Sequence, residues 1–138
     1  LCKKAGVSRM AFYNNYESRD NWLRQIIYFQ TNLLIERIGS PFREKTNVEW
    51  YVKMFECIKE KNIYLKTIFN ADFKFEYLSA INDLVLHDGS ISSTDKYLRL
   101  MWAGGVVNTI IYWVESNMND SIIEMANFCY NNLSVWTK

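Results

Sequence analysis

Proline and glycine are scarce in this sequence of 138 residues. One proline and five glycines are too few for the frequent turns of an all-β protein. Apolar residues make up 49% and aromatic residues 16% of the chain, which is enough to form a core and argues against extended disorder. The length fits one compact domain with a small module attached to it. We therefore predict an all-α fold of about eight helices.

Residues suited to metal binding, redox chemistry or catalysis are also few. The three cysteines, Cys2, Cys57 and Cys129, are odd in number and far apart. We interpret them as reduced thiols of a cytoplasmic protein and not as a disulfide framework. The chain has one histidine, His87, no CxxC or HxxxH spacing for zinc and no glycine-rich loop for phosphate. We therefore expect no metal, no cofactor and no enzymatic activity.

The net charge of +1 is unevenly distributed. Residues 1–24 carry five basic and two acidic side chains, a net charge of +3, so the remaining residues sum to −2. A basic end on a slightly acidic body is typical of a nucleic-acid-binding module joined to an unrelated domain. A solvated helix face gives the same pattern, so charge alone leaves both interpretations open.

Capping residues divide the first forty residues into three predicted helices. We expect a helix tail that ends at Gly6, a short helix from Ser8 to about Tyr16, and a long helix that begins at Ser18 and stops before Pro41. Further along, apolar periodicity and capping patterns predict helices over residues 46–61, 62–69, 73–86, 93–117 and 121–135.

The short predicted helix that begins at Ser8 has an outward face of polar and basic side chains. Two helices joined by a tight turn that contains glycine form a helix-turn-helix, whose second helix enters the major groove of DNA. Arg9 can donate to guanine, Asn14 can pair with adenine, and Met10 can contact a thymine methyl group. The predicted DNA-binding set comprises Ser8, Arg9, Met10 and Asn14, with Tyr13, Asn15 and Arg19 as phosphate contacts.

The residues around this helix resemble the motif of the tetracycline-repressor (TetR/AcrR) family. The matching positions are Ala5-Gly6-Val7-Ser8, Phe12-Tyr13, Tyr16, Arg19, Asp20 and Leu23. Asn15 stands where that family usually has histidine, Arg19 where lysine is usual, and Ala11 where threonine is common. Asn15 can still donate to a phosphate oxygen and Arg19 keeps the positive charge, so we expect DNA binding to be retained.

The resemblance implies a transcriptional regulator, a repressor that binds a palindromic double-stranded operator as a dimer and is released by a small-molecule effector. It divides the chain into residues 1–25, the C-terminal part of a helix-turn-helix DNA-binding domain, and residues 26–138, a helical effector-binding and dimerisation domain. It also implies that the first helix and most of the second helix of the DNA-binding module are absent before Leu1. Val7 and Phe12 would then lose apolar partners, so we expect this form to bind operator DNA poorly. The alternative is a helical dimerisation or interaction protein without DNA binding.

The last two predicted helices are apolar on nearly every side. The stretch from Tyr97 to Val114 contains Arg99 and Asn108, so we interpret it as a buried helix and predict no membrane span. Residues 101–107 also look like part of the paired helices by which the TetR/AcrR family dimerises, and we predict a homodimer. A buried helix pair within one subunit is the alternative. The predicted interface comprises Trp102, Val106, Ile110, Trp113, Ala126, Cys129 and Leu133.

The central helices are rich in aromatic residues, which suits an apolar small-molecule site. The candidate ligand-binding residues are Phe55, Tyr64, Phe69, Phe73, Tyr77 and Trp102. Each of them, taken singly, also fits a position in the core. Asp72, Glu76 and Asp83 lie in the same region; we interpret them as parts of solvated helix faces, with contact to a cationic effector as the alternative.

Overall fold

The computed structural model describes residues 5–42, 47–89 and 93–133, with side chains described over 19–42, 47–89 and 95–133. Within these ranges the chain forms six α-helices and no strand, which confirms the predicted all-α fold. The helices are α1 (Ala5–Ile38), α2 (Val48–Glu60), α3 (Asn62–Asn70), α4 (Lys74–Leu86), α5 (Ser93–Glu115) and α6 (Ile122–Leu133).

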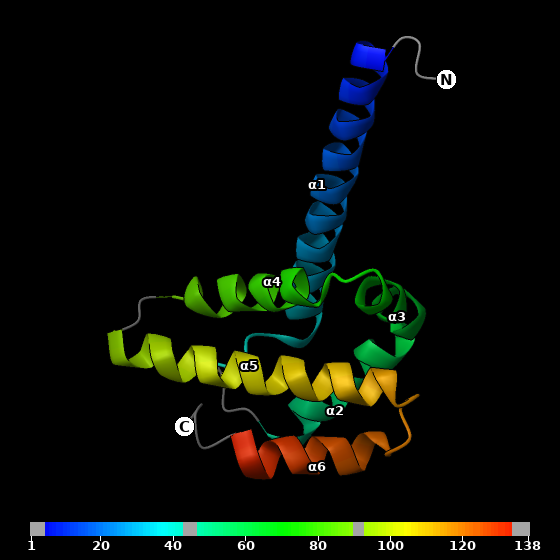
Figure 1. The fold of residues 1–138 in the computed structure, drawn as a ribbon. Helices are drawn as coiled ribbons and strands as arrows, with labels where there is room; N and C mark the ends of the chain where they lie inside the picture. The colour runs from blue at the N-terminus through cyan, green and yellow to red at the C-terminus, as the bar shows by residue number, and fades with distance from the viewer. Residues whose placement is uncertain (1–4, 43–46, 90–92, 134–138) are drawn as a thin grey trace.

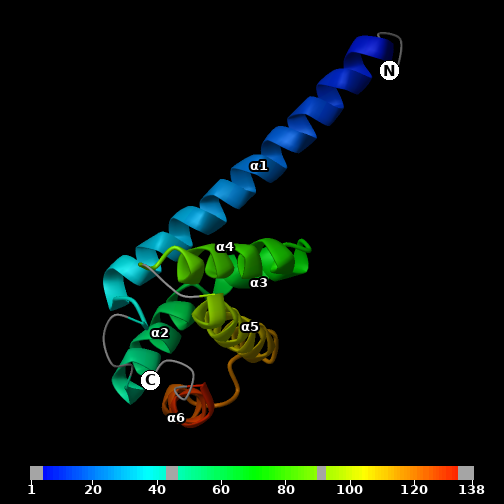
Figure 2. The ribbon, with the colours of Figure 1, turned by 90° about the vertical axis from the view of Figure 1, so that its left-hand side faces the viewer.

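The first helix, α1, has 34 residues, and its N-terminal half projects from the rest of the molecule (Figures 1 and 2). We call residues 5–23 the arm and the described residues from 24 onward the body. In the body, the C-terminal half of α1 lies against α4 and α2. One end of the same helix is therefore free of the body, and the other end forms part of its wall.

The break that a helix-turn-helix requires is absent from α1. We expected a helix end at Gly6, a short helix from Ser8 to Tyr16 and a new helix at Ser18, but α1 continues through all of these positions. No proline interrupts it, and glycine or serine inside a helix costs only about 1 kcal/mol or less relative to alanine. Helix propagation thus outweighs the local capping signals. The predicted end is correct: Gly39, with φ +83°, donates its N–H to the Ile35 carbonyl (2.8 Å).

Capping side chains begin two of the later helices. The Asn47 side chain accepts a hydrogen bond from the Trp50 N–H (3.0 Å) at the start of α2. Thr46, the first residue of the predicted helix, lies one residue earlier and outside the described residues. Ser121 caps α6 as predicted, because its hydroxyl accepts a hydrogen bond from the Glu124 N–H (3.2 Å). The bounds of α3, α4 and α5 also agree with the predicted ranges to within about two residues.

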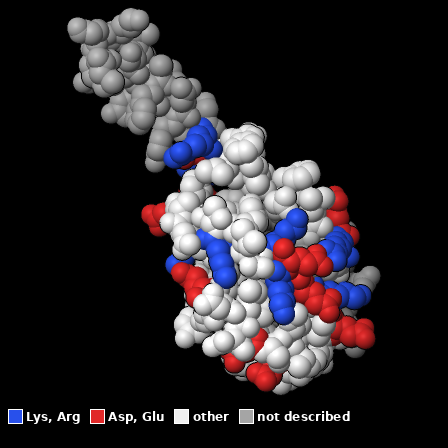
Figure 3. Space-filling view, turned by 90° about the vertical axis from the view of Figure 1, so that its right-hand side faces the viewer, with Lys and Arg blue, Asp and Glu red and all other residues white. Residues whose placement is uncertain are grey.

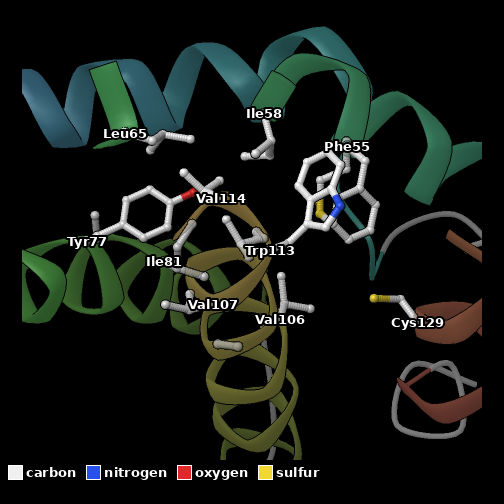
Figure 4. Close-up of a cluster of buried hydrophobic side chains, with 14 of the residues drawn as sticks. Phe55, Ile58, Leu65, Tyr77, Ile81, Val106, Val107, Trp113, Val114 and Cys129 are labelled. Atoms are coloured by element: carbon white, nitrogen blue, oxygen red, sulfur yellow. The ribbon is translucent and has the colours of Figure 1, made fainter. Parts of the chain in front are cut away.

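The core of the body forms where α2, α3, α4, α5 and α6 converge (Figure 4). Phe55 of α2 packs edge to face on Trp113 of α5, with ring centroids 5.1 Å apart. The Trp113 indole N–H donates to the Asp120 carbonyl (2.8 Å) in the turn between α5 and α6. Cys129 of α6 is fully buried against this cluster. Burial of each such large side chain contributes about 1.5–3 kcal/mol to folding.

The predicted dimer-interface residues lie in the core of one chain, which corrects our interpretation of the last two helices. Six of the seven residues are buried without any partner subunit, and these are Trp102, Val106, Ile110, Trp113, Ala126 and Cys129. The seventh, Leu133, is partly buried against the core. A Cβ atom at Gly105 would lie 3.0 Å from the Leu133 side chain, so α5 and α6 approach each other closely at this glycine. The opposite face of α5 is exposed.

Candidate functional site

A pocket of about 490 Å³ lies in the body between α1, α2, α4 and α5, and we call it the aromatic pocket. Its apolar lining includes Ile35, Ile38, Phe42, Trp50, Met54, Tyr77, Ile81, Trp102, Val106 and Ile110. Its polar lining comprises Tyr28, Asn32, Ser40, Asp83, His87 and Asp88. An apolar cavity of this size with a few polar groups is typical of small-molecule sites.

Three rings form one wall of the aromatic pocket. Trp102 lies 5.2 Å from Phe42 and 5.9 Å from Trp50, measured between ring centroids. The Trp50 indole N–H donates to the Gly39 carbonyl (3.1 Å), and the Trp102 indole N–H donates to the Tyr51 hydroxyl (3.0 Å). These bonds fix the Trp50 and Trp102 rings in place and use the only polar atom of each indole, so both rings present apolar surface to the pocket.

Two carboxylates of the polar lining each accept a hydrogen bond from a hydroxyl group. The Tyr28 hydroxyl donates to Asp83 (2.6 Å), and this hydrogen bond, together with burial and the Asp83 charge, raises the pKa of Tyr28. The Ser40 hydroxyl donates to Asp88. Because Tyr28 lies on α1 and Asp83 on α4, the first of these bonds joins the two helices across the pocket.

Arg99 of α5 supports the pocket from outside its lining. Its guanidinium donates to the carbonyls of Val85 (2.9 Å) and Asp88 (2.8 Å). The same group lies 4.5 Å from the centroid of the Phe42 ring, within the range of a cation–π contact. Arg99 therefore fixes the position of the Phe42 ring relative to the C-terminal end of α4.

A second pocket, of about 450 Å³, shares Leu34 and Tyr77 with the aromatic pocket and is bounded by α1, α2 and α3. The Tyr64 hydroxyl in its wall is buried and has no hydrogen-bond partner among the described residues. Burial raises the pKa of Tyr64 to about 12. An unpaired hydroxyl beside a cavity is a position where a bound polar atom would be favourable.

The structure divides the six predicted ligand-binding residues between pockets and core. Tyr77 and Trp102 line the aromatic pocket, and Tyr64 lines the second pocket. Phe55 and Phe69 are buried in the core, and Phe73 is packed against it. The sequence did not single out the contribution of α1, whose residues Tyr28, Asn32 and Ile35 line the aromatic pocket. Their spacing of four and three residues could have indicated one inward-facing stripe.

The predicted DNA-binding residues all lie on the arm. Ser8, Arg9, Met10, Tyr13, Asn14 and Asn15 fall on α1 at positions where no side chain is described. Arg19 is exposed. On the body face shown in Figure 3, lysine and arginine side chains lie among aspartate and glutamate side chains. Such an interspersed pattern is typical of a solvated surface, whereas a nucleic-acid-binding face concentrates positive charge.

The outward faces of α5 and α6 carry large exposed apolar side chains. Tyr112 is 76%, Phe128 56% and Ile123 54% exposed. Tyr112 and Phe128 line a groove of about 530 Å³ between the two helices. Our sequence interpretation assigned dimerisation to these helices but chose residues on their inner faces, because both faces of each helix are apolar.

The described residues contain no group of three or more histidine, cysteine, aspartate or glutamate side chains that could hold a metal ion. At His87, the Nδ1 atom lies 2.7 Å from the Asp83 carbonyl oxygen. Over the described parts of the chain, none of the helices combines the length and apolar character needed to cross a membrane.

Comparison with known proteins found no matching family model, no similar curated protein and no similar solved structure.

Proposed function

We propose that the protein is a cytoplasmic ligand-responsive transcriptional regulator of the repressor type. It binds palindromic double-stranded DNA as a homodimer and is released when a small molecule occupies the aromatic pocket. One observation carries the proposal: a single helix, α1, holds the TetR/AcrR-like motif at one end and lines the pocket at the other. A ligand that favours one position of α1 over another would change the placement of the motif, which is the differential contact that coupling requires.

The polar connection between α1 and α4 supports this coupling. Tyr28 donates to Asp83 (2.6 Å), and Arg24 lies 3.9 Å from Glu76. Both pairs join the part of α1 nearest the arm to the helix that forms the far wall of the pocket. A ligand that disturbs the first pair would loosen α1 close to the point where it leaves the body.

The DNA-binding half of the proposal is tested by selecting duplexes from a randomised pool and then titrating selected and scrambled duplexes at several salt concentrations. The 138-residue chain is used throughout. We expect Arg9→Ala to cost roughly 1–3 kcal/mol and to relax base preference, and Arg19→Ala to lower the salt slope by about one. Lys53→Ala, an equal loss of charge on the body, is the control. Unchanged binding by Arg9→Ala would contradict the assignment.

The homodimer is proposed to form through the outward faces of α5 and α6. Phe128→Glu would place a charge in that contact and should shift the sedimentation coefficient toward the monomer value. Phe75→Glu is the matched control, because Phe75 is 72% exposed on α4. A wild-type chain that sediments as a monomer at micromolar concentration would contradict the dimer.

A helical interaction protein without DNA binding is the second candidate. The observation that favours it is the uninterrupted α1, which has no turn between a support helix and a recognition helix. Trp22, Phe29 and Leu33 also form an exposed apolar stripe on this helix, with a spacing that suits helix-to-helix contact. Selection experiments that enrich no duplex sequence would favour this candidate.

A further inference from the structure

The hydrogen-bonding groups of the aromatic pocket offer a ligand acceptors more than donors. The hydroxyls of Tyr28 and Ser40 donate to Asp83 and Asp88. The indole N–H groups of the aromatic wall are directed at other protein atoms, as described above. Asn32 is the one lining side chain whose amide both donates and accepts. A ligand that brings its own donors or a positive charge is therefore the better match.

The charge of the pocket lining also favours a positively charged ligand. Asp83 and Asp88 contribute two carboxylates, and the lining contains no lysine or arginine. Among the described residues, no lysine or arginine forms an ion pair with Asp83. The nearby Arg99 directs its guanidinium at two backbone carbonyls and the Phe42 ring. An anionic ligand would meet the like charge of Asp83 here, with no lysine or arginine among the lining residues to offset it.

The apolar wall adds a second attraction for cations. Trp50 and Trp102 line the cavity, and the face of an indole ring attracts a cation within about 6 Å of its centre. Aliphatic side chains, among them Ile35, Ile81 and Val106, also line the cavity and would hold the apolar part of a ligand. A carboxylate, two indole rings and aliphatic surface thus occur together in one cavity.

From these features we infer that the aromatic pocket binds an organic cation with an apolar or aromatic group. The positive charge of this ligand lies beside Asp83, and its apolar or aromatic group lies against Trp50 and Trp102. The inference rests on the proposed function, because it treats this pocket as the effector site. Its test needs no DNA, so the two can fail separately. Loss of sequence-selective DNA binding would leave the ligand class intact, and loss of the cation preference would leave DNA binding intact.

The test uses two ions of the same shape and opposite charge, tetraphenylphosphonium and tetraphenylborate, titrated calorimetrically into the intact chain. We expect the cation to bind at least about ten-fold more tightly, because a carboxylate and ring faces favour it and repel the anion. Equal or tighter binding of the anion would overturn the inference. So would the absence of binding by both ions.

Variants then assign the preference to Asp83. Asp83→Asn removes the charge, keeps the shape and should weaken cation binding about five-fold or more, since one pocket charge is lost. The matched control is Asp72→Asn, which removes the same charge from an exposed position outside the pocket. Asp72 has φ +70°, a conformation that asparagine adopts readily, so this control should fold normally and change cation affinity less than about two-fold. Equal effects of the two variants would overturn the assignment.

A third variant should change cation affinity in the opposite direction to Asp83→Asn. Tyr28→Phe removes the hydroxyl that donates to Asp83 and leaves the carboxylate free for a ligand. Cation affinity should therefore hold or increase by about two-fold, the effect of one neutral hydrogen-bond donor no longer competing. A five-fold loss of cation affinity in this variant would show that the Tyr28 hydroxyl holds the ligand itself, and would overturn the proposed role of Asp83.

Discussion

Trp22 and Trp113 are the same type of residue in opposite surroundings. Trp22 lies on the arm with 61% of its surface exposed, whereas Trp113 is 2% exposed and contacts Phe55 edge to face. The arm is one helix without other elements around it (Figure 2), and the body is five helices and the end of α1 around a common core. The arm has the backbone hydrogen bonds of a helix, whereas the body also has a core of packed side chains.

The largest expected effect is the difference in unfolding free energy between replacing a tryptophan of the body and replacing a tryptophan of the arm. Trp113→Ala should lower the free energy of unfolding by about 3–5 kcal/mol, because it leaves a cavity and removes the bond to the Asp120 carbonyl. Trp22→Ala should change it by less than about 0.5 kcal/mol. Urea unfolding followed by circular dichroism measures both. A large effect at Trp22 would show that the arm is packed against something in solution.

A proline on the arm tests whether α1 is continuous. In a continuous helix, Arg19→Pro costs about 3 kcal/mol locally and should unwind residues 5–18, because so short a helix is marginal alone. If a separate helix began at Ser18, position 19 would be its first residue, where proline is well tolerated. Far-UV circular dichroism should lose ellipticity while the urea midpoint of the body stays unchanged. Arg19→Ala is the control, and full ellipticity in the proline variant would restore the predicted break.

A smaller effect is expected at a polar contact inside the body. Tyr51→Phe removes the hydroxyl that accepts the Trp102 indole N–H (3.0 Å) and leaves that donor buried. The free energy of unfolding should decrease by about 1–3 kcal/mol. Tyr112→Phe removes a hydroxyl from a side chain that is 76% exposed and should leave the denaturation midpoint unchanged. Similar midpoints for both variants would mean that another acceptor replaces Tyr51.

The smallest expected effect is at the surface of the body. Arg37 donates to Glu60 (2.8 Å), and this hydrogen bond and the Arg37 charge lower the pKa of Glu60. A carboxyl group with a lowered folded-state pKa contributes stability above its unfolded pKa of about 4.3, and loses it as the pH falls through the folded pKa. Glu60→Gln should therefore reduce slightly the loss of stability below about pH 4. Glu56→Gln, exposed on the same helix, is the control, and the two acid-unfolding curves should differ.

The later helices could be predicted from sequence because local and tertiary signals agree there. Ser121 caps α6, and the apolar periodicity of α2 matches its buried face. At Ser8 and Ser18 the capping signals compete with helix propagation, and the sequence does not say which is stronger. The two faces of α5 presented a different difficulty. Val106 and Tyr112 are both compatible with burial, and only the positions of the neighbouring helices decide that the first lies inside and the second outside.

The pocket was harder to predict than the helices, because its walls come from four of them. Trp102 and Tyr77 could be named from aromatic content alone. Tyr28 and Asp83 are 55 positions apart in the chain, and neither belongs to a motif. Their meeting depends on how α1 crosses α4, which is a property of the assembled body.

Cys57 and Cys129 can report local opening of the folded chain through their rates of thiol labelling. Both thiols are free and buried, and burial raises the pKa of each, that of Cys129 to about 12. A thiol reagent attacks the thiolate, so neither cysteine should be labelled until the helix that covers it moves away. The labelling rate at Cys129 would then report how often α6 separates from α2. The rate at Cys57 would report how often the second pocket opens. A ligand that closes the second pocket should therefore slow the labelling of Cys57 and leave the labelling rate of Cys129 unchanged.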